Sequence, residues 1–174
     1  MGCCCSSNKN KYDVFLSFRG EDTRDNFTSH LCKALSQKKI KIYVDDMLER
    51  GDEISTALLK AIKKSRVSII IFSENYASSS WCLDELVQIL KCKKKNNKHR
   101  VIIPVFYGVD PSRLRSQHTK FVFSSKGSKA KRRAWREALN HAANISGWGS
   151  QNIRPESKLV EAIVEDVMKK LNRS

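Results

Sequence analysis

Short apolar runs that alternate with amphipathic helical segments constrain the fold of this chain most. Four runs have the length and the β-branched and aromatic content of strands: Asp13–Phe18, Ile40–Val44, Val67–Phe72 and Val101–Phe106. A fifth, short strand is expected around Ala142–Ile145. Such alternation predicts a parallel sheet with helices on both of its faces.

Between and after these runs, apolar residues recur at every third or fourth position, which is the spacing of a helix face that packs on a core. Three such stripes are Phe27, Leu31, Cys32 and Leu35; Ile54, Leu58, Leu59 and Ile62; and Leu159, Ile163, Val167 and Leu171. The stretch from Ser112 to Lys131 has weak periodicity, so no element is assigned to it.

The composition is that of one globular domain. The chain has 174 residues, of which 40% are hydrophobic, enough for a core without disulfides. The apolar runs are far too short to span a bilayer. The six cysteines and four histidines show no ligand spacing, so we expect no metal site and a reducing, cytoplasmic compartment.

The chain is strongly basic, with 33 Lys and Arg against 18 Asp and Glu and a net charge of +15. The excess concentrates in Lys91–Arg100 and Lys126–Arg133. The simplest interpretation is that these segments are solvated surfaces. The alternatives are attraction to anionic lipid, binding of nucleic-acid phosphates, and electrostatic steering of an anionic dinucleotide. Aromatic residues do not interleave with the lysines, so the sequence shows no stacking platform for single-stranded nucleic acid.

Residues 1–11 lack the apolar residues of a core, and we expect a disordered tail. Gly2 after the initiator Met, with Ser6 at the required offset, matches the myristoylation pattern. Because one myristoyl chain binds membranes only marginally, Cys3, Cys4 and Cys5 are expected as palmitoylation sites. The alternative is an ordinary tail with a fortuitous Gly2. Lipidation predicts attachment to the inner face of a membrane, most simply the plasma membrane.

A serine cluster before Trp81 is an N-cap signal, and a helix is expected to begin there. On this helix Asp84 and Gln88 are expected in water, and Glu85 on the margin of the apolar face, one turn after Trp81. A carboxylate beside an aromatic ring suits a ligand that contains a sugar and a base. The alternatives are a solvated Glu85 and a Trp81 that only anchors the core.

Four segments, in order along the chain, resemble the plant Toll/interleukin-1 receptor (TIR) domain. They are Tyr12–Arg24 (YDVFLSFRGEDTR), Tyr43–Ile54 (YVDDMLERGDEI), Ser80–Leu86 (SWCLDEL) and Val101–Pro111 (VIIPVFYGVDP). The resemblance implies a TIR domain over residues 12–172, with a flavodoxin-like α/β fold and a five-stranded parallel sheet in the order 2-1-3-4-5.

In such a sheet, ligands bind beyond the carboxyl ends of the strands, where the resembling segments lie. The resemblance implies an enzyme that cleaves NAD+, with Glu85 as the catalytic carboxylate. Arg19 and Gly20 follow the first strand, where an arginine suits a phosphate contact; a solvated arginine in a loop is the alternative. Ser79 is expected near the ribose and Trp81 near the base. Asp110–Pro111 is interpreted as a turn.

Arg50 and Gly51 match the BB loop, which in this family opens and closes over the site and helps form filaments. A plain surface loop packed by Leu48 is the alternative. Cleavage of the nicotinamide–ribose bond builds positive charge on the anomeric carbon, which a carboxylate stabilises. No cofactor is expected, because NAD+ is the expected substrate, with NADP+ as a further candidate.

The resemblance also implies self-association through Ser29, His30 and Gly147, with other TIR domains as partners and lipase-like immune complexes downstream of the nucleotide products. We expect an NAD+ nucleosidase in plant immune signalling and cell death. The alternatives are a membrane-tethered scaffold without significant catalysis and a nucleic-acid-processing synthetase of cyclic nucleotides. The chain shows no P-loop, and whether it is a TIR-only protein or part of a longer receptor stays open.

Overall fold

The computed structural model describes residues 12–45, 54–95, 100–116 and 127–172. Five parallel strands form one sheet in the order β2-β1-β3-β4-β5, as the resemblance predicted. Their bounds are Tyr12–Phe18 for β1, Ile42–Val44 for β2, Ser65–Phe72 for β3, Val101–Phe106 for β4 and Trp148–Gly149 for β5. The switch in strand order lies beside β1, which pairs with β2 on one side and β3 on the other.

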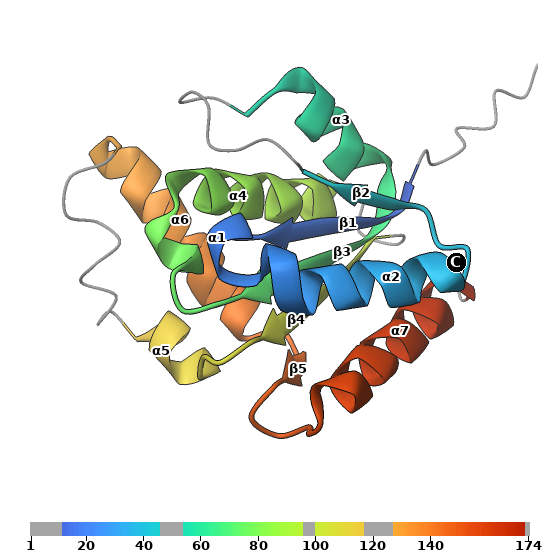
Figure 1. Ribbon diagram of the computed structural model, residues 1–174. Coiled ribbons are helices and arrows are strands. Elements are labelled where there is room, and N and C mark those ends of the chain that lie inside the picture. Colours follow the sequence, from blue (N-terminus) through green and yellow to red (C-terminus); the bar gives the residue numbers. More distant parts are fainter. Residues whose placement is uncertain (1–11, 46–53, 96–99, 117–126, 173–174) are drawn as a thin grey trace, which may run out of the picture.

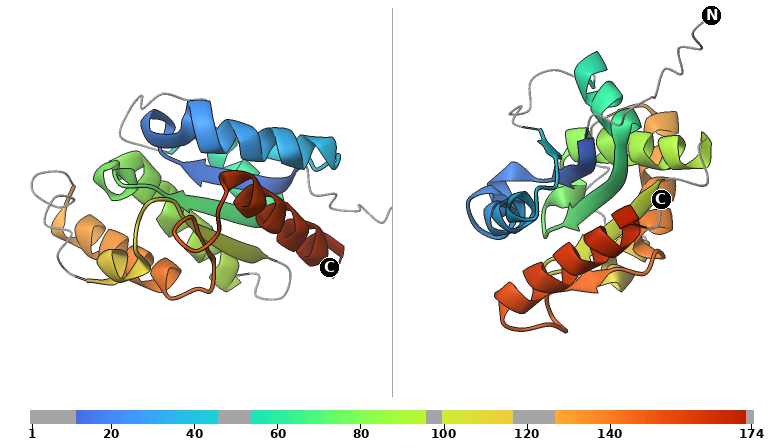
Figure 2. Two further views of the ribbon diagram at one scale, coloured as in Figure 1. Left: turned by 60° about the horizontal axis from the view of Figure 1, so that its bottom comes forward. Right: turned by 90° about the vertical axis from the view of Figure 1, so that its right-hand side faces the viewer.

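Helices cover both faces of the sheet (Figure 1; Figure 2). One face carries α2 (Ser29–Gln37) and α7 (Glu156–Asn172), and the other carries α3 (Thr56–Lys64), α4 (Ser80–Lys95) and α6 (Lys129–Ala143). The short helical pieces are α1 (Gly20–Thr23), η1 (Arg24–Thr28), η2 (Tyr76–Ser78) and α5 (Pro111–Arg115). No helix among the described residues has the length and apolarity needed to cross a membrane.

The strands divide their side chains between two cores. On β1, Phe15 packs with α3, α4 and α6, whereas Val14 and Leu16 pack with α2 and α7. Successive side chains of a strand point to opposite faces, and both faces of this sheet are covered, so the runs are apolar at most positions instead of alternating with polar residues. The predicted helix stripes supply the opposing surfaces, including Leu31 and Ile163.

The prediction of a fifth strand at Ala142–Ile145 was wrong. Ala142 and Ala143 end α6, and the strand follows at Trp148–Gly149, where it pairs with Val105 and Phe106. Ala142 continues the buried stripe of α6 that begins with Trp135, and a short apolar run alone does not distinguish strand from helix. The predicted turn at Asp110–Pro111 is confirmed: Asp110 caps α5, accepting from the Ser112 N–H, and Pro111 occupies its first turn.

Candidate active site

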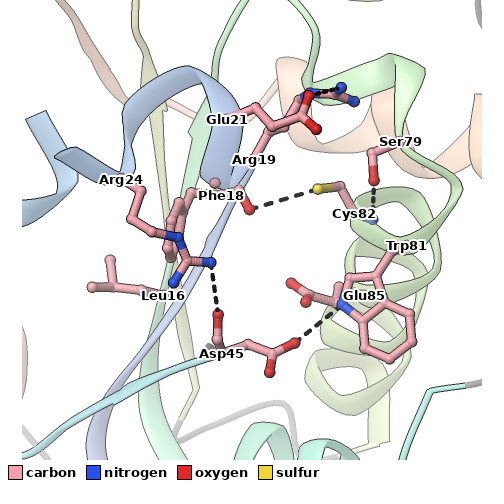
Figure 3. Close-up of a pocket in the computed structure, with 11 residues that line it drawn as sticks. Leu16, Phe18, Arg19, Glu21, Arg24, Asp45, Ser79, Trp81, Cys82 and Glu85 are labelled. Carbon is pink, nitrogen blue, oxygen red and sulfur yellow. Dashed lines mark hydrogen bonds and ion pairs between the residues drawn. The ribbon is translucent and has the colours of Figure 1, made fainter. Parts of the chain in front are cut away.

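A cavity of about 320 Å³ opens at the carboxyl ends of β1 and β2, beside the first turns of α4. Its lining comes from segments that are far apart in the sequence: Leu16, Phe18, Arg19, Gly20, Glu21, Arg24, Asp45, Ser79, Trp81, Cys82 and Glu85 (Figure 3). The cavity lies at the switch in strand order, where ligands of open α/β sheets bind. Five predicted site residues therefore line one space: Arg19, Gly20, Ser79, Trp81 and Glu85.

The expected helix start is correct within one residue, because α4 begins at Ser80. The Ser79 hydroxyl accepts a hydrogen bond from the Cys82 N–H at 3.2 Å, as an N-cap residue does. Ser79 is itself buried, so this hydroxyl lies at the wall of the cavity and not in bulk water. Its expected contact with a ribose stays a prediction.

Glu85 does not lie on a solvated margin, as its helical position suggested. It is only 3% exposed, because the ends of β1 and β2 cover that flank of α4. In Figure 3 its carboxylate points from α4 toward the side of the cavity on which Arg24 lies. Among the described residues, its Oε2 atom has no hydrogen-bond partner. A buried carboxylate oxygen without a partner is costly, and such groups are concentrated at functional sites.

The surroundings of Glu85 favour its neutral form. Burial, the largest cause, and the nearby charge of Asp45 together raise the pKa of Glu85 from 4.5 to about 8. Hydrogen bonding with Ser17 and Trp81 acts in the opposite direction. Loss of hydration penalises a charged group, and a like charge adds to that penalty. The carboxyl is therefore poised to change its charge near neutral pH.

Asp45 is a site residue that the pattern of the sequence did not single out. It ends β2, is 9% exposed, and accepts a 3.1 Å hydrogen bond from the Trp81 indole Nε1. Its backbone carbonyl accepts from Arg24 Nη2 at 3.4 Å. Asp45 thus connects both walls of the cavity. In the sequence it looks like one of several acids in a loop, and only the fold places it against α4.

The two arginines near the cavity differ in their surroundings. Arg19 makes ion pairs with Glu21 and Asp22, which occupy part of its guanidinium. Arg24 lies with its guanidinium carbon 5.3 Å from the centre of the Phe18 ring and donates to Asp45. Arg24 was not predicted as a site residue, although it ends the first resembling segment. It is well placed for an anionic group that enters beside Glu85.

Gly20 has a steric role in this arrangement. A Cβ atom at this position would lie 2.9 Å from both Nε and Nη2 of Arg24. Glycine therefore allows the guanidinium of Arg24 to lie against the backbone of the turn that follows β1. Gly20 was predicted as a substrate-binding residue. The structure gives a physical reason for a glycine at this position, because a side chain would displace the neighbouring Arg24.

The loop after β3 is fastened to α1 at the rim of the site. The Asp22 carboxylate accepts hydrogen bonds from the Ser73 hydroxyl and from the backbone N–H of Asn75, the latter at 3.0 Å. Below this rim the buried Tyr76 hydroxyl is hydrogen-bonded to Ser17 at 2.8 Å and donates to the Cys82 carbonyl at 3.1 Å. These bonds fix the start of α4 relative to β1, and with it the position of Glu85.

The expectation that Asp84 lies in water was wrong. Its carboxylate accepts from the Trp135 indole at 2.7 Å and pairs with Lys131 at 2.8 Å. Packing of α6 against α4 covers this side of α4, which a helical projection of α4 alone does not reveal. Part of the basic segment at the start of α6 therefore has an intrachain acidic partner.

The residues expected at a self-association surface lie away from the cavity. His30 is exposed on α2, but its Nδ1 lies 3.2 Å from Glu156 of α7, so it has an intrachain contact that was not expected. The Ser29 hydroxyl donates to the Asn26 carbonyl. Gly147 packs on β4: a Cβ there would lie 2.2 Å from the Pro104 carbonyl oxygen. Gly2, Cys3, Cys4, Cys5, Arg50 and Gly51 lie outside the described residues.

The fold and the constellation around Glu85 define a TIR domain. The TIR domain family matches residues 11–174, and the chain belongs to this family. It is 50% identical over 165 residues to disease resistance protein RUN1 of Vitis rotundifolia, covering 92% of this chain and 12% of that protein. It is 44% identical over 179 residues to TMV resistance protein N of Nicotiana glutinosa, covering 98% and 16%. The chain thus spans only a small part of the length of these relatives.

Solved structures agree with this assignment. The TIR domains of the activated Roq1 resistosome, which directly recognises the pathogen effector XopQ, are 48% identical with a TM-score of 0.77, over 90% of this chain and 99% of that chain. The heterodimer of the RPS4 and RRS1 TIR domains gives 26% identity and a TM-score of 0.57, over 91% and 96%. The chain is therefore a TIR domain similar to those of plant disease resistance proteins.

Proposed function

We propose that this TIR domain cleaves the nicotinamide–ribose bond of NAD+, with Glu85 as the catalytic carboxylate. The observation that carries the proposal is the burial of Glu85 against the cavity, with Oε2 lacking a partner among the described residues. A buried carboxyl group without a full set of hydrogen bonds lowers the stability of the fold. A bound ligand that develops positive charge next to Glu85 would offset this cost.

The arrangement suits the chemistry of this bond. As nicotinamide leaves, positive charge develops on the anomeric carbon, and an ionised Glu85 stabilises that charge. The nicotinamide ring of NAD+ is itself cationic, so its approach would favour the ionised form of Glu85 in spite of the raised pKa. Nicotinamide leaves as a neutral molecule, so no general acid is needed. Water is the acceptor in simple hydrolysis, giving ADP-ribose-type products.

The remaining side chains have complementary tasks in this proposal. Arg19, directly after β1, and Arg24, at the start of η1, line the cavity and can contact the diphosphate of NAD+. Trp81 is half-buried at the cavity, and its indole N–H donates a hydrogen bond to Asp45. The face of the indole ring can then pack against the base. NADP+ is a second candidate substrate. No cofactor enters the reaction.

The biological role that we propose is plant immune signalling that leads to cell death, with activity dependent on self-association. The support is the similarity to disease resistance proteins and to TIR domains that were solved as assemblies, the Roq1 resistosome and the RPS4–RRS1 heterodimer. Nucleotide products would then carry the signal to lipase-like immune complexes.

The direct test is release of nicotinamide from NAD+ by purified protein. Glu85→Gln keeps the shape of the side chain and removes its charge, so we expect turnover to fall by about a hundredfold or more. Glu137→Gln is the matched control, since Glu137 is exposed on α6 and pairs with Arg133. Equal turnover by the wild type and Glu85→Gln would refute a catalytic carboxylate. An inactive wild type at high concentration would favour a scaffold without significant catalysis.

A further inference from the structure

Most of the described lysines lie at the end of the sheet opposite the candidate active site. In a parallel sheet the helix before each strand ends where that strand starts, and α2, α3 and α4 all obey this rule, while α7 ends at the same edge (Figure 1). The exposed lysines in the last turns of these helices, or next to them, are Lys38, Lys39, Lys41, Lys63, Lys64, Lys91, Lys94, Lys95 and Lys169. We call this surface the lysine end.

Acidic residues are distributed in the opposite way. Most described acids lie just after a strand or early in the next helix, at the active-site end: Glu21, Asp22, Asp25, Asp45, Glu74, Asp84, Glu85, Asp110 and Glu156. Near the lysine end, Asp13 accepts from the backbone N–H of Lys41 at 2.8 Å, and Asp166 pairs with Lys170 at 2.9 Å. Glu165 lies two turns before the end of α7. The lysine end is therefore strongly positive.

Two arginines near the starts of β3 and β4 donate hydrogen bonds to helix ends at this surface, whereas the lysines face outward. Arg100 donates to the carbonyls of Ile62 and Lys63 at the end of α3, the first at 3.1 Å. Arg66 donates to the Leu171 carbonyl at the end of α7. These bonds satisfy carbonyl groups that a helix leaves open at its C-terminus. The neighbouring Lys63 and Lys64 are exposed, so they stay available for an external anion.

We propose that the lysine end docks on an anionic lipid membrane, with the candidate active site directed away from the bilayer. Lysines spread over four helix ends make a broad positive surface, which fits a layer of anionic headgroups. Residue Tyr12, where β1 begins, lies at the same end, so residues 1–11 with the acylation pattern at Gly2 join the domain there. One lipid chain holds a protein only marginally, and a basic surface is an effective second signal.

In this orientation the bilayer and the candidate active site lie at opposite ends of the sheet. The longest strand, β3, has 8 residues, which corresponds to roughly 26 Å from the lysine end to the active-site end. A ligand would therefore reach the cavity from the aqueous side. Single-stranded nucleic acid is less well suited to the lysine end, because none of the described Phe, Tyr and Trp side chains is exposed for stacking.

The test measures binding of the unacylated full chain to phosphatidylcholine vesicles with and without 30% phosphatidylserine, by co-sedimentation. We expect binding only with phosphatidylserine, and weaker binding at high salt. Replacing Lys63, Lys64 and Lys95 together by Gln should lower the affinity roughly a hundredfold, about fivefold for each lysine. The matched variant replaces Lys129, Arg132 and Arg133 of α6 by Gln, which removes the same charge at another place, and should bind nearly as the wild type does.

Several outcomes would overturn the proposal. Equal losses in the two triple variants would mean that net charge, and not the lysine end, governs binding. Absence of binding to anionic vesicles would reject the surface as a membrane contact. A lysine-end variant that keeps vesicle binding but loses binding to an RNA duplex would assign the surface to nucleic acid. Circular dichroism confirms that each variant is folded, and none of these results depends on NAD+ cleavage.

Discussion

The indole Nε1 of Trp81 donates a 3.1 Å hydrogen bond to the carboxylate of Asp45, joining the first turn of α4 to the end of β2. The same carboxylate raises the pKa of Glu85, for which burial is the larger cause. Asp45 therefore both positions the indole and affects the charge of the candidate catalytic group.

Replacement of Asp45 by Asn should shift the pH dependence of NAD+ cleavage. The amide oxygen can still accept from Trp81, but the like charge near Glu85 is gone, so the pKa of Glu85 falls. If ionised Glu85 is the active form, the rising limb of kcat/KM against pH should move down by roughly one unit. Asp25→Asn, an exposed acid on η1, is the control, and an unshifted limb in Asp45→Asn would contradict a coupled pair.

Glu85→Gln should be more stable than the wild type at alkaline pH. The fold raises the pKa of Glu85 from 4.5 to about 8, so its favourable contribution is complete below about pH 4.5 and is lost as pH rises through about 8. Gln carries no such penalty. We expect the difference in unfolding free energy to grow across this window to a few kcal/mol, in order of magnitude, in favour of Glu85→Gln. Urea titrations at pH 5 and pH 9 measure it; a constant difference would argue against a neutral buried Glu85.

Gly20→Ala should act through Arg24. The added methyl group meets the flexible end of the Arg24 side chain at 2.9 Å, so the guanidinium must move while the fold tolerates the change. We expect KM for NAD+ to rise several-fold, with little change in melting temperature. A double-mutant cycle with Arg24→Ala checks the route, because Gly20→Ala should then have no further effect. Full additivity of the two changes would exclude it.

Gly147→Ala should destabilise the domain itself. The added Cβ would lie 2.2 Å from the carbonyl oxygen of Pro104, and a backbone atom of a central strand does not yield easily. A loss of about 1–3 kcal/mol is expected from overpacking of this kind. Gly149→Ala is the milder comparison, since its Cβ meets only the Asn152 amide at 3.4 Å. A role of Gly147 in self-association can be assigned only if thermal unfolding of Gly147→Ala at low concentration is normal.

Ser29→Ala combined with His30→Ala should lower NAD+ cleavage steeply at low protein concentration and less at high concentration. Both residues are exposed on α2, and in a two-fold contact each change alters both sides of the interface. The His30–Glu156 pair is exposed and contributes little to stability, so misfolding is not expected. Glu156→Gln tests whether loss of that pair alone explains the effect. Specific activity independent of concentration in all three proteins would rule out activation by self-association.

The order and type of most elements could be read from the sequence, because they depend on local periodicity. The runs ending at Phe18, Phe72 and Phe106 are apolar at nearly every position, as is typical of strands covered on both faces. The serine cluster before α4 marked the helix start through a local capping bond. The failure at Ala142–Ile145 has a local cause too, since a segment of four residues, three of them apolar, suits either periodicity.

What the sequence by itself determined is therefore the order of the sheet, the helices α2, α3, α4 and α7, and Glu85 as the candidate catalytic residue. Only the tertiary structure decided that Glu85 is buried, that Asp45 and Arg24 line the same cavity from other segments, and that Asp84 faces α6. Burial and charge coupling depend on contacts between residues tens of positions apart, and a helical projection contains no information about what covers each face. The separation of lysines and acids to opposite ends of the sheet has the same origin: parallel topology gathers every helix end at one edge.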